Sequence, residues 1–262
     1  MKLNETLVRL SQTTLNTMYP TGIKCIFCGY ELSSKTDTCT CEKCQKNLPF
    51  IDDKKICEIC GNQIKSLAPI CETCHGKKPA YIIARAPFEY TGKIRFIISR
   101  FKYNNEKYLA KPLSYFMAQV YLRNNYNCDL IIFSPLSNEK LKKRGFNQAE
   151  LLANELSERL NLEVKKDIII KVKNTITQTK LTQFERKINL KNAFIISNKK
   201  QIKNKSVLLV DDVFTTGTTV EHISTLLINS GAKEVKVLTL AHTNFYNKHN
   251  HEAKKYLITN FD

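Results

Sequence analysis

The sequence lacks any apolar run that approaches the roughly 18 residues needed to cross a membrane. Its first 20 residues also lack the apolar core of a secretion signal, and their leucines follow instead the spacing of a short amphipathic helix: Leu3, Leu7, Leu10 and Leu15. No lysine follows Gly217 as in a Walker loop, and no three glycines have the dinucleotide-binding spacing. These absences predict a cytoplasmic protein without a transmembrane segment, and they exclude the P-loop and dinucleotide-binding classes.

Acidic residues are scarce relative to basic ones. The 262 residues include 24 Asp and Glu against 41 Lys and Arg, which gives a formal net charge of +17 at pH 7. Such an excess favours polyanionic partners, either nucleic acid or an anionic membrane surface. The hydrophobic fraction of 42% is that of an ordinary globular chain, and this length can bury one large domain or one medium and one small domain.

The stretch VLLVDDVFTTGTT, residues 207–219, carries the most chemistry. Its apolar start is short and β-branched, as in a strand that is buried on both faces of a parallel sheet. Asp211 and Asp212 follow where this strand is expected to end. After them comes a hydroxyl-rich turn and then the apolar spacing of a helix, at Val220, Ile223, Leu226 and Leu227, with Gly231 as a stop.

A strand, a hydroxyl-rich turn and a helix form a phosphate cradle. Backbone N–H groups at a helix start can hold an anion, and Gly217 lets the backbone approach closely. Hydroxyl donors come from four threonines: Thr215, Thr216, Thr218 and Thr219. Asp211 and Asp212 repel phosphate, but they can accept hydrogen bonds from two sugar hydroxyls or help to hold Mg²⁺ through water. The sequence therefore predicts a sugar-phosphate site; a strand end and helix cap that bind nothing are the alternative.

The same stretch resembles the signature of the type I phosphoribosyltransferases, which bind phosphoribosyl pyrophosphate with Mg²⁺. The resemblance implies an α/β fold with a parallel sheet, in which Asp211 and Asp212 contact the ribose hydroxyls and residues 215–219 hold the 5-phosphate. It also implies a pyrophosphate-binding loop after an earlier strand, and the basic segment that ends at Arg144 and Gly145 takes that place in the order. Arg144 is the candidate to meet pyrophosphate, because a guanidinium fork matches phosphate oxygens. The candidate catalytic residues are Asp211, Asp212 and Arg144.

Eight of the ten cysteines form four Cys-x-x-Cys pairs: Cys25/Cys28, Cys41/Cys44, Cys57/Cys60 and Cys71/Cys74. Both sulfurs of such a pair reach one ion, and two pairs complete a tetrahedral zinc site. In a reducing cytosol, metal ligation is favoured over disulfides. We expect two sequential ribbons that hold two structural zinc ions, with a cross-braced arrangement as the alternative. Cys39 is left over and can substitute for Cys41.

The remaining segments predict the elements around these sites. Strands are expected at 81–90, 129–135, 167–173, 193–197 and 234–242, and the last two are expected in the parallel sheet. Two amphipathic helices are expected over 92–125, with a break near Asn104. A long helix is expected to begin at Phe146, after a basic turn. The basic residues between 93 and 107 are explained most simply by a solvated helix face. Residues 174–194 are expected to form a hood over the site, with a plain surface hairpin as the alternative.

The predicted organisation has four parts: an N-terminal amphipathic segment (1–22), a zinc-ribbon domain (23–79), a phosphoribosyltransferase-like domain (80–246) and a C-terminal tail (247–262). Five segments together resemble the ComF-type competence proteins: the cysteine-rich ribbons, YTGKIRFIISRFKY, KLKKRGFNQAELLA, QTKLTQFERKINLKNAF and VLLVDDVFTTGTT. That resemblance implies a bacterial protein of natural transformation that handles incoming single-stranded DNA, with a DNA-uptake helicase or membrane channel components as candidate partners. It leaves the acceptor of the ribosyl phosphate open. The alternative is a non-catalytic single-stranded DNA-binding factor that uses the transferase fold to sense a ligand.

Overall fold

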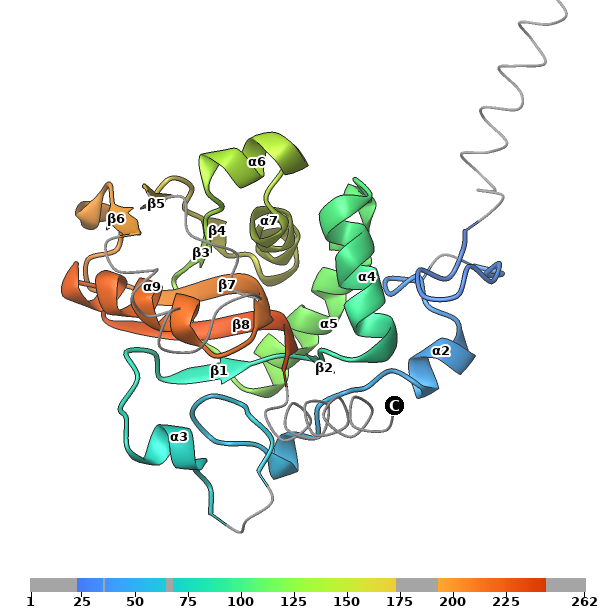
Figure 1. Ribbon diagram of the computed structural model, residues 1–262, viewed down its shortest axis with the longest axis horizontal. Helices are drawn as coiled ribbons and strands as arrows, with labels where there is room; N and C mark the ends of the chain where they lie inside the picture. Colours follow the sequence, from blue (N-terminus) through green and yellow to red (C-terminus); the bar gives the residue numbers. More distant parts are fainter. Residues whose placement is uncertain (1–22, 35, 65–67, 173–192, 244–262) are drawn as a thin grey trace, which may run out of the picture. The chain divides into compact units, whose positions relative to one another are not determined.

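The computed structural model describes residues 23–34, 36–64, 68–172 and 193–243 (Figure 1). Three predicted segments therefore lie wholly or almost wholly outside the described residues: the N-terminal amphipathic segment, the hood and the C-terminal tail. None of the described helices is long and apolar enough to cross a membrane. The chain divides into two compact units, Met1–Asn47 and Leu48–Asp262.

The described part of the first unit is a single cysteine ribbon. Lys24 and Glu31 pair in an antiparallel bridge, and the turn between them holds Gly29 at a φ of 75°. Helix α2 (Glu42–Lys46) follows, with Cys41 as its N-cap. Few apolar side chains are buried in so small a ribbon, so hydrophobic burial alone is a weak source of stability for it.

The second unit begins with a ribbon of the same design. It contains the short helix η1 (Asp53–Lys55), an antiparallel bridge between Ile56 and Gln63, and helix α3 (Glu72–His75). The ribbon and the large sheet belong to one compact unit that starts at Leu48, so the predicted boundary at residue 79 falls inside it.

The large sheet is parallel throughout, as expected for this α/β chain. Its strands follow the spatial order β1 (Ile83–Arg85), β8 (Glu234–His242), β7 (Ser206–Phe214), β3 (Leu130–Phe133) and β4 (Glu163–Val164), and β2 (Phe88–Glu89) pairs with the last residues of β8. β7 and β8 are central, which explains their nearly continuous apolar runs.

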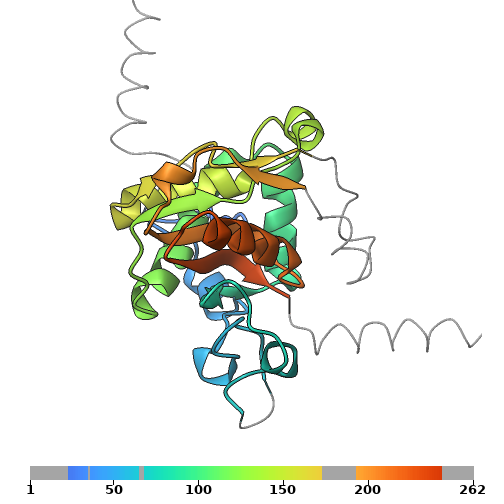
Figure 2. The same cartoon turned by 90° about the vertical axis from the view of Figure 1, so that its left-hand side faces the viewer.

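Helices cover both faces of this sheet. α9 (Thr218–Asn229) packs on one face, and α5 (Ala110–Arg123) and α7 (Gln148–Leu160) pack on the other (Figures 1 and 2). Burial follows the two-residue period of a strand, since Val207 and Leu209 of β7 share a core cluster with Ile223 of α9. The alternate residues of β7 are equally buried, which requires the cover that α7 provides.

Two expected strands lie elsewhere. β5 (Ile169–Lys171) and β6 (Phe194–Ile196) pair antiparallel with each other in a separate two-stranded sheet, so residues 193–197 do not extend the parallel sheet. The central residues of both strands are partly solvated: Ile170 is 41% exposed and Ile195 is 47% exposed. A strand covered on both faces does not leave such side chains in water.

The helices before and after β3 differ in part from expectation. α4 (Gly92–Tyr103) ends at Asn104 as predicted, and the short helix η2 (Lys107–Leu109) leads into α5. The predicted basic turn is a helix, α6 (Asn138–Arg144), which buries none of its residues and therefore shows no apolar stripe in the sequence. α7 begins two residues later than predicted because the side chain of Asn147 caps it.

Candidate functional site

Neighbouring strands of different length create the site. β3 ends at Phe133, whereas β7 continues along β8 as far as Phe214. Asp211 and Asp212 are expected from the sequence to follow the strand, but both lie within β7, where Asp211 pairs with Thr239 of β8. The two acids therefore project beyond the end of β3, while the strand that carries them keeps its hydrogen bonds on the other side.

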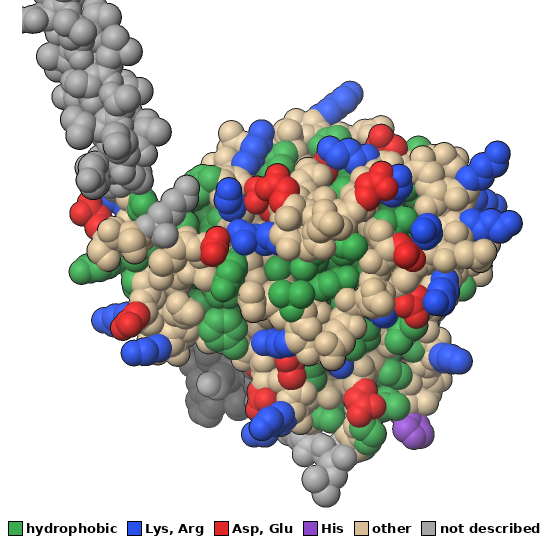
Figure 3. Space-filling model, turned by 180° about the vertical axis from the view of Figure 1, so that it is seen from behind, with side chains coloured by type: hydrophobic (Ala, Val, Ile, Leu, Met, Phe, Trp, Pro, Cys, Tyr) green, Lys and Arg blue, Asp and Glu red, His purple; other side chains and the backbone are tan. Residues whose placement is uncertain are grey.

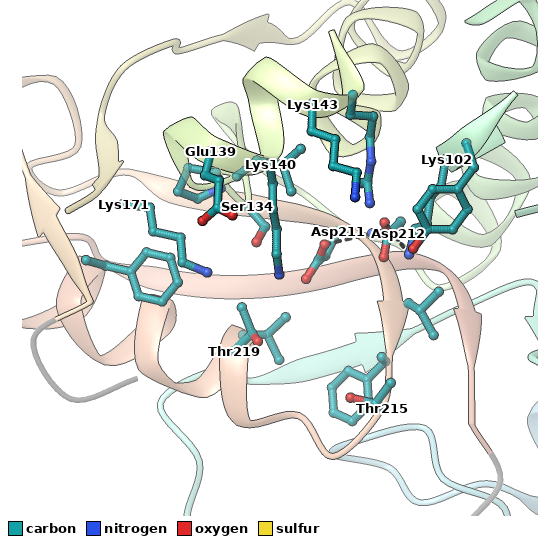
Figure 4. Close-up of a pocket in the computed structure, with 18 of the residues that line it drawn as sticks. Lys102, Ser134, Glu139, Lys140, Lys143, Lys171, Asp211, Asp212, Thr215 and Thr219 are labelled. Atoms are coloured by element: carbon teal, nitrogen blue, oxygen red, sulfur yellow. Dashed lines mark hydrogen bonds and ion pairs between the residues drawn. The ribbon is translucent and has the colours of Figure 1, made fainter. Parts of the chain in front are cut away.

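The two carboxylates are held by different groups. Nζ of Lys102, from α4, lies 2.7 Å from Oδ2 of Asp212, and both side chains are 18% exposed (Figure 4). Oδ1 of Asp211 accepts a hydrogen bond from the Asp212 backbone N–H at 2.8 Å. An ion pair thus orients one acid, and the backbone orients the other.

These surroundings place the titration of Asp211 near neutral pH. Burial, followed by the negative charge of Asp212, raises the pKa of Asp211 to about 7, although the Asp212 N–H and Lys102 act in the opposite direction. Burial lowers the pKa of Lys102, but the charge of Asp212 and the hydrogen bond to it outweigh burial and leave that pKa raised. Lys102 is therefore a cation at neutral pH.

The hydroxyl-rich loop connects β7 to α9. Gly217 is the N-cap of α9 and has a φ of 73°, a left-handed conformation that glycine adopts without strain. A Cβ atom at this position would lie 2.6 Å from Cζ of Phe214, so the phenyl ring occupies the space under the loop. The hydroxyls of Thr216 and Thr218 lie 2.7 Å apart and share a hydrogen bond.

Helix α6 supplies cations above the acids. Lys140 and Lys143 extend from it toward β7 (Figure 4). Arg144, the last residue of α6, donates a hydrogen bond to Oε1 of Gln148, and its guanidinium carbon lies 5.2 Å from the centroid of the Tyr103 ring. The Arg144 side chain is thus oriented by α7 and α4.

The acids, the loop and α6 surround a cavity of about 730 Å³. Its lining includes six of the predicted site residues: Arg144, Asp211, Asp212, Thr215, Gly217 and Thr219. Three others do not line it within the described part of the chain: Thr216, Thr218 and Gly145. The hydroxyls of the two threonines share a hydrogen bond, and Gly145 forms the left-handed C-cap of α6. All three residues therefore belong to the turns that border the cavity.

The cavity also contains residues that the sequence did not indicate. Among them are Lys102, Ser134, Lys140, Lys171 and Phe194. Lys102 lies in the basic stretch that the sequence explains as a solvated helix face. It shares a helix face with the buried Ile98, four residues earlier, but that spacing does not predict its ion pair with Asp212. Lys171 and Phe194 reach the cavity through the antiparallel pairing of β5 with β6, which their local sequence does not reveal.

Positive charge is crowded in this cavity. Burial, then the charge of Lys140, lowers the pKa of Lys171 to about 8. Burial, then the charges of Arg144 and Lys102, lowers the pKa of Lys140 as well. A polyanion would relieve this crowding, and a hydroxylated group would suit the two acids below it. The arrangement therefore fits a ligand that carries several phosphate charges and a sugar diol.

The cysteines form two sequential tetrads rather than a cross-braced pair: Cys25, Cys28, Cys41 and Cys44, and Cys57, Cys60, Cys71 and Cys74. Within each tetrad the sulfurs lie within 4.8 Å of one another, and two neighbouring sulfurs are 3.7 Å apart in both. Four thiolates at about 2.3 Å from a tetrahedral zinc ion lie about 3.8 Å apart, so both tetrads can bind metal ions such as zinc. Cys39 belongs to neither tetrad of the described residues, and its thiol donates to the Thr36 carbonyl oxygen at 3.4 Å.

The second tetrad is built into the core of the large unit. Its four cysteines share a core cluster with Tyr81 and Phe214. Arg85, only 8% exposed, donates to the carbonyl oxygens of Cys57 at 3.3 Å and Glu58 at 3.0 Å. These hydrogen bonds fix the first turn of the ribbon to β1.

Comparison with known proteins agrees with this architecture. The family profile described as phosphoribosyl transferase domain matches residues 141–261. Competence protein F of Haemophilus influenzae is 33% identical over 228 residues, which cover 84% of this chain and 97% of that protein. DNA utilization protein YhgH of Escherichia coli K12 is 31% identical over 196 residues, 73% of this chain and 86% of that protein. Competence protein ComFC of Streptococcus pneumoniae is 28% identical over 232 residues, 83% of this chain and 99% of that protein.

The match to competence protein F is longer than the transferase domain alone and extends over nearly all of that protein. The fold expected from the sequence, a parallel-sheet phosphoribosyltransferase-type domain preceded by a cysteine-rich region, is confirmed. On these grounds the chain belongs to the ComF family of competence proteins.

Proposed function

We propose that this chain is a cytoplasmic enzyme of DNA uptake that binds phosphoribosyl pyrophosphate with Mg²⁺ and transfers the ribosyl phosphate to an acceptor. The observation that carries the proposal is the convergence of Asp211, Asp212 and the loop at 215–219 on one cation-rich cavity. The family profile supports the sugar-phosphate substrate, and the names of the relatives support a role in competence or DNA utilization.

Three parts of the cavity match three parts of this substrate. The loop and the first N–H groups of α9 receive the 5-phosphate, because a helix start offers backbone donors without intrahelical partners. Asp211 and Asp212 accept hydrogen bonds from the ribose hydroxyls, and their oxygens are the ligand type that Mg²⁺ prefers. The pyrophosphate lies under the cations of α6: Lys140, Lys143 and Arg144.

The reaction depends on charge stabilisation more than on acid–base groups. The bond between the anomeric carbon and the pyrophosphate oxygen breaks, and pyrophosphate leaves with the bonding electrons. The nucleophilic atom of the acceptor forms a new bond to that carbon and loses its proton to water. The α6 cations stabilise the charge on the departing pyrophosphate, and Mg²⁺ bound with the substrate supplies further positive charge.

Thermal unfolding with ligand tests the binding step. Phosphoribosyl pyrophosphate with Mg²⁺ is expected to raise the melting temperature of the full chain, and the double variant Asp211→Asn/Asp212→Asn to abolish the rise. Asp53→Asn is the control, because Asp53 pairs with Arg123 in an ion pair at 2.7 Å that is not part of the cavity lining. No ligand-dependent rise in the wild type would overturn the proposal.

A pyrophosphate-release assay tests the reaction. The acceptors are free bases, nucleosides, nucleotides and single-stranded DNA ends, and release with one of them identifies the acceptor class. Ligand stabilisation without release for any acceptor would favour the alternative, in which the fold senses phosphoribosyl pyrophosphate without turning it over.

We further propose that each tetrad holds one structural zinc ion. Metal analysis of the purified full chain is expected to give two zinc ions, and Cys28→Ser to give one.

On the family relationship we also propose a DNA-uptake helicase or membrane channel component as a protein partner. Co-purification of such a component with the tagged chain from competent cells tests that part.

Association with single-stranded DNA is a second function that we propose, because α4 carries a stripe that suits it. Its outer face repeats cations and aromatic rings at helical spacing: Lys93, Phe96, Arg100, Tyr103, and then Lys107 at the start of η2. Phe96 is 62% exposed and Tyr103 is 72% exposed, whereas the opposite face of α4 is buried. We call these five residues the α4 stripe.

Contacts within and beside the α4 stripe combine rings with guanidinium groups. The guanidinium carbon of Arg100, which is paired with Glu106, lies 5.9 Å from the Phe96 ring centroid. That of Arg144 lies 5.2 Å from the Tyr103 centroid and leaves this ring 72% exposed. Unpaired bases stack on such exposed rings while the cations contact the phosphates, and duplex bases are not available in this way. By contrast, Lys and Arg side chains on the face in Figure 3 are scattered, with acidic side chains between them.

Binding of labelled single-stranded DNA tests the α4 stripe. Phe96→Ala is expected to weaken binding about tenfold or more, because the loss of one base–aromatic stack costs roughly 1–3 kcal/mol. Leu122→Ala is the matched control, since Leu122 is an equally exposed apolar residue (57%) on α5. Equal affinities of the two variants would remove the α4 stripe from the DNA site, and a binding constant independent of salt would count against phosphate contacts.

A further inference from the structure

His242 lies between the second cysteine tetrad and the hydroxyl-rich loop. It is the last residue of β8 and is 3% exposed. Its Nε2 atom lies 3.0 Å from the carbonyl oxygen of Cys60, a member of the tetrad, and its Nδ1 atom lies 2.9 Å from the Thr243 carbonyl oxygen. The imidazole thus reaches the backbone of a predicted metal ligand from the far end of the central sheet.

The flat side of the same imidazole supports the loop. The His242 and Phe214 rings are stacked, with centroids 4.5 Å apart and an angle of 14° between their planes. The Phe214 ring in turn occupies the space under Gly217, and the Tyr81 ring meets it edge-on at 6.3 Å. Movement of His242 therefore requires movement of the ring on which the loop rests.

The other end of this chain of contacts is also fixed. The turn that contains Cys57 and Cys60 closes through Gly61, whose N–H donates to the Cys57 carbonyl oxygen at 3.0 Å. Gly61 approaches the sheet so closely that a Cβ atom would lie 2.6 Å from the Ala84 carbonyl oxygen. Four metal-bound thiolates would hold this turn in place, because structural zinc supplies folding energy to small ribbons.

We propose that His242 is a positioning residue that couples metal binding at the second tetrad to anion binding at residues 215–219. Cys60, His242, Phe214 and Gly217 form a continuous packed path, and closely packed interiors transmit displacement rather than absorb it. Loss of the metal releases the Cys60 turn, and the loop then loses the support of the two stacked rings. The coupling is reciprocal, so an anion on the loop must strengthen metal binding by the same factor.

The first test needs no ligand. Hydrogen exchange at the amides of residues 215–219 is compared between the wild type and three full-length variants. His242→Phe keeps a ring but has no nitrogen to meet the Cys60 carbonyl oxygen, and His242→Gln offers an amide N–H there but has no ring. Leu240→Ala, in the same strand, is the control for general loss of stability because Leu240 is fully buried and is not part of the path.

His242→Gln, which has no ring, is expected to speed loop exchange about tenfold relative to Leu240→Ala at matched global stability, and His242→Phe, which keeps a ring, is expected to speed it less. Equal loop exchange in the three variants would overturn the proposal. His242→Gln is expected to retain metal better than His242→Phe but to protect the loop less, because an amide N–H can bond the Cys60 carbonyl oxygen, whereas only a ring can stack on Phe214. The reverse order would contradict that assignment.

The second test measures the coupling itself and rests on the proposed function in one respect, that phosphoribosyl pyrophosphate binds the loop. Cys28→Ser first removes metal binding by the other tetrad. Zinc affinity is then measured by competition with a chelator, with and without phosphoribosyl pyrophosphate and Mg²⁺. We expect the ligand to raise zinc affinity about tenfold, within the usual range for coupled sites, and His242→Phe to reduce the factor to near one.

The outcomes separate the two proposals. If the ligand raises the melting temperature but leaves zinc affinity unchanged, the coupling is wrong and the proposed substrate stands. If the ligand does not bind, the proposed substrate is wrong, and the hydrogen-exchange comparison still decides the role of His242. Cadmium NMR gives an independent reading, since the resonance of the second tetrad is expected to shift on ligand addition in the wild type but not in His242→Phe.

Discussion

Nζ of Lys102 and the carboxylate of Asp212 lie 2.7 Å apart and join α4 to the central strand of the sheet. The pair is largely shielded from water, so it is not an ordinary surface ion pair. Because Asp211 directly precedes Asp212, Lys102 also offsets the repulsion between the two carboxylates. The lysine is therefore as much a part of the site as the acids are.

Replacement of Lys102 by methionine is expected to weaken both the fold and ligand binding. Loss of one partner from a mostly buried pair should lower the free energy of unfolding by about 1–3 kcal/mol. Affinity for phosphoribosyl pyrophosphate at pH 7 should fall about tenfold and recover partly at higher pH, because the pKa of Asp211 is raised to about 7 and Lys102 holds it down. Calorimetry from pH 6 to 9 measures both effects. Lys142→Met, an exposed lysine of α6 that does not line the cavity, is the control.

The raised pKa of Asp211 predicts how stability depends on pH. Its folded pKa of about 7 exceeds the unfolded value of about 3.9, so between those values the folded state binds a proton that the unfolded state lacks. This contribution is complete below pH 4 and is lost as the pH rises through 7, by an amount on the order of 4 kcal/mol, because the two pKa values differ by about three units. Asp211→Asn removes it, so the difference between wild type and variant should slope downward from pH 4 to 7 and be level above.

Chemical unfolding at half-unit pH steps, without ligand or Mg²⁺, measures that difference. The charged groups that face Asp211 are Asp212, Lys102 and Lys171, and all three are present in the variant. Asp53→Asn should leave the pH profile parallel to that of the wild type. A flat difference curve for Asp211→Asn would show that this carboxylate titrates in the normal acidic range.

Two glycines with nearly the same backbone conformation give a matched pair. Gly217 has a φ of 73° and Gly145 has a φ of 79°, so alanine at either position suffers the same left-handed strain of about 1–2 kcal/mol. Only Gly217→Ala adds a clash with Phe214, because no atom of the described residues lies within 4 Å of the place that a methyl group on Gly145 would take. Gly217→Ala should therefore destabilise the chain more than Gly145→Ala and abolish phosphate binding at the loop. Thermal unfolding with and without phosphoribosyl pyrophosphate compares them, and equal losses would mean that the phenyl ring yields.

The two tetrads should differ in how far metal loss spreads. Cys41 and Cys71 are N-caps of the short helices α2 and α3 in equivalent positions. Cys71→Ser removes a metal ligand from the large core, so it should lower the main melting temperature by roughly 10 °C or more. Cys41→Ser should also lose one zinc ion but leave the main transition nearly unchanged. Calorimetry with metal analysis tests this, and an equally large drop for both variants would show that the two units unfold together.

Residues with strong local chemistry were predictable from the sequence. The Cys-x-x-Cys spacing predicts the tetrads, and the apolar run before Asp211 predicts the central strand. The structure extends that strand through both acids because β8 continues beside it after β3 has ended. Strand length in a sheet is set by the neighbouring strand, and a single segment does not contain that information.

Side chains that reach the cavity from distant segments were not predictable in the same way. Lys102 precedes Asp212 by more than a hundred residues, and its role depends on where α4 packs. Helix α6 has a single apolar residue, Leu141, so hydrophobic periodicity does not predict it. The contact between His242 and Cys60 joins the two ends of the large unit, and the sequence around either residue does not predict it.

The placement of Asp211 and Asp212 within β7 has a consequence for the entropy of ligand binding. When a side chain binds a ligand, its backbone loses less conformational entropy if it lies in a strand than if it lies in a flexible turn. The pairing of β7 with β8 has already restricted the φ and ψ angles of the two acids. The acidic side of the cavity is thus preorganised, and under the proposed function any adjustment on binding of the sugar phosphate falls to the loop at 215–219.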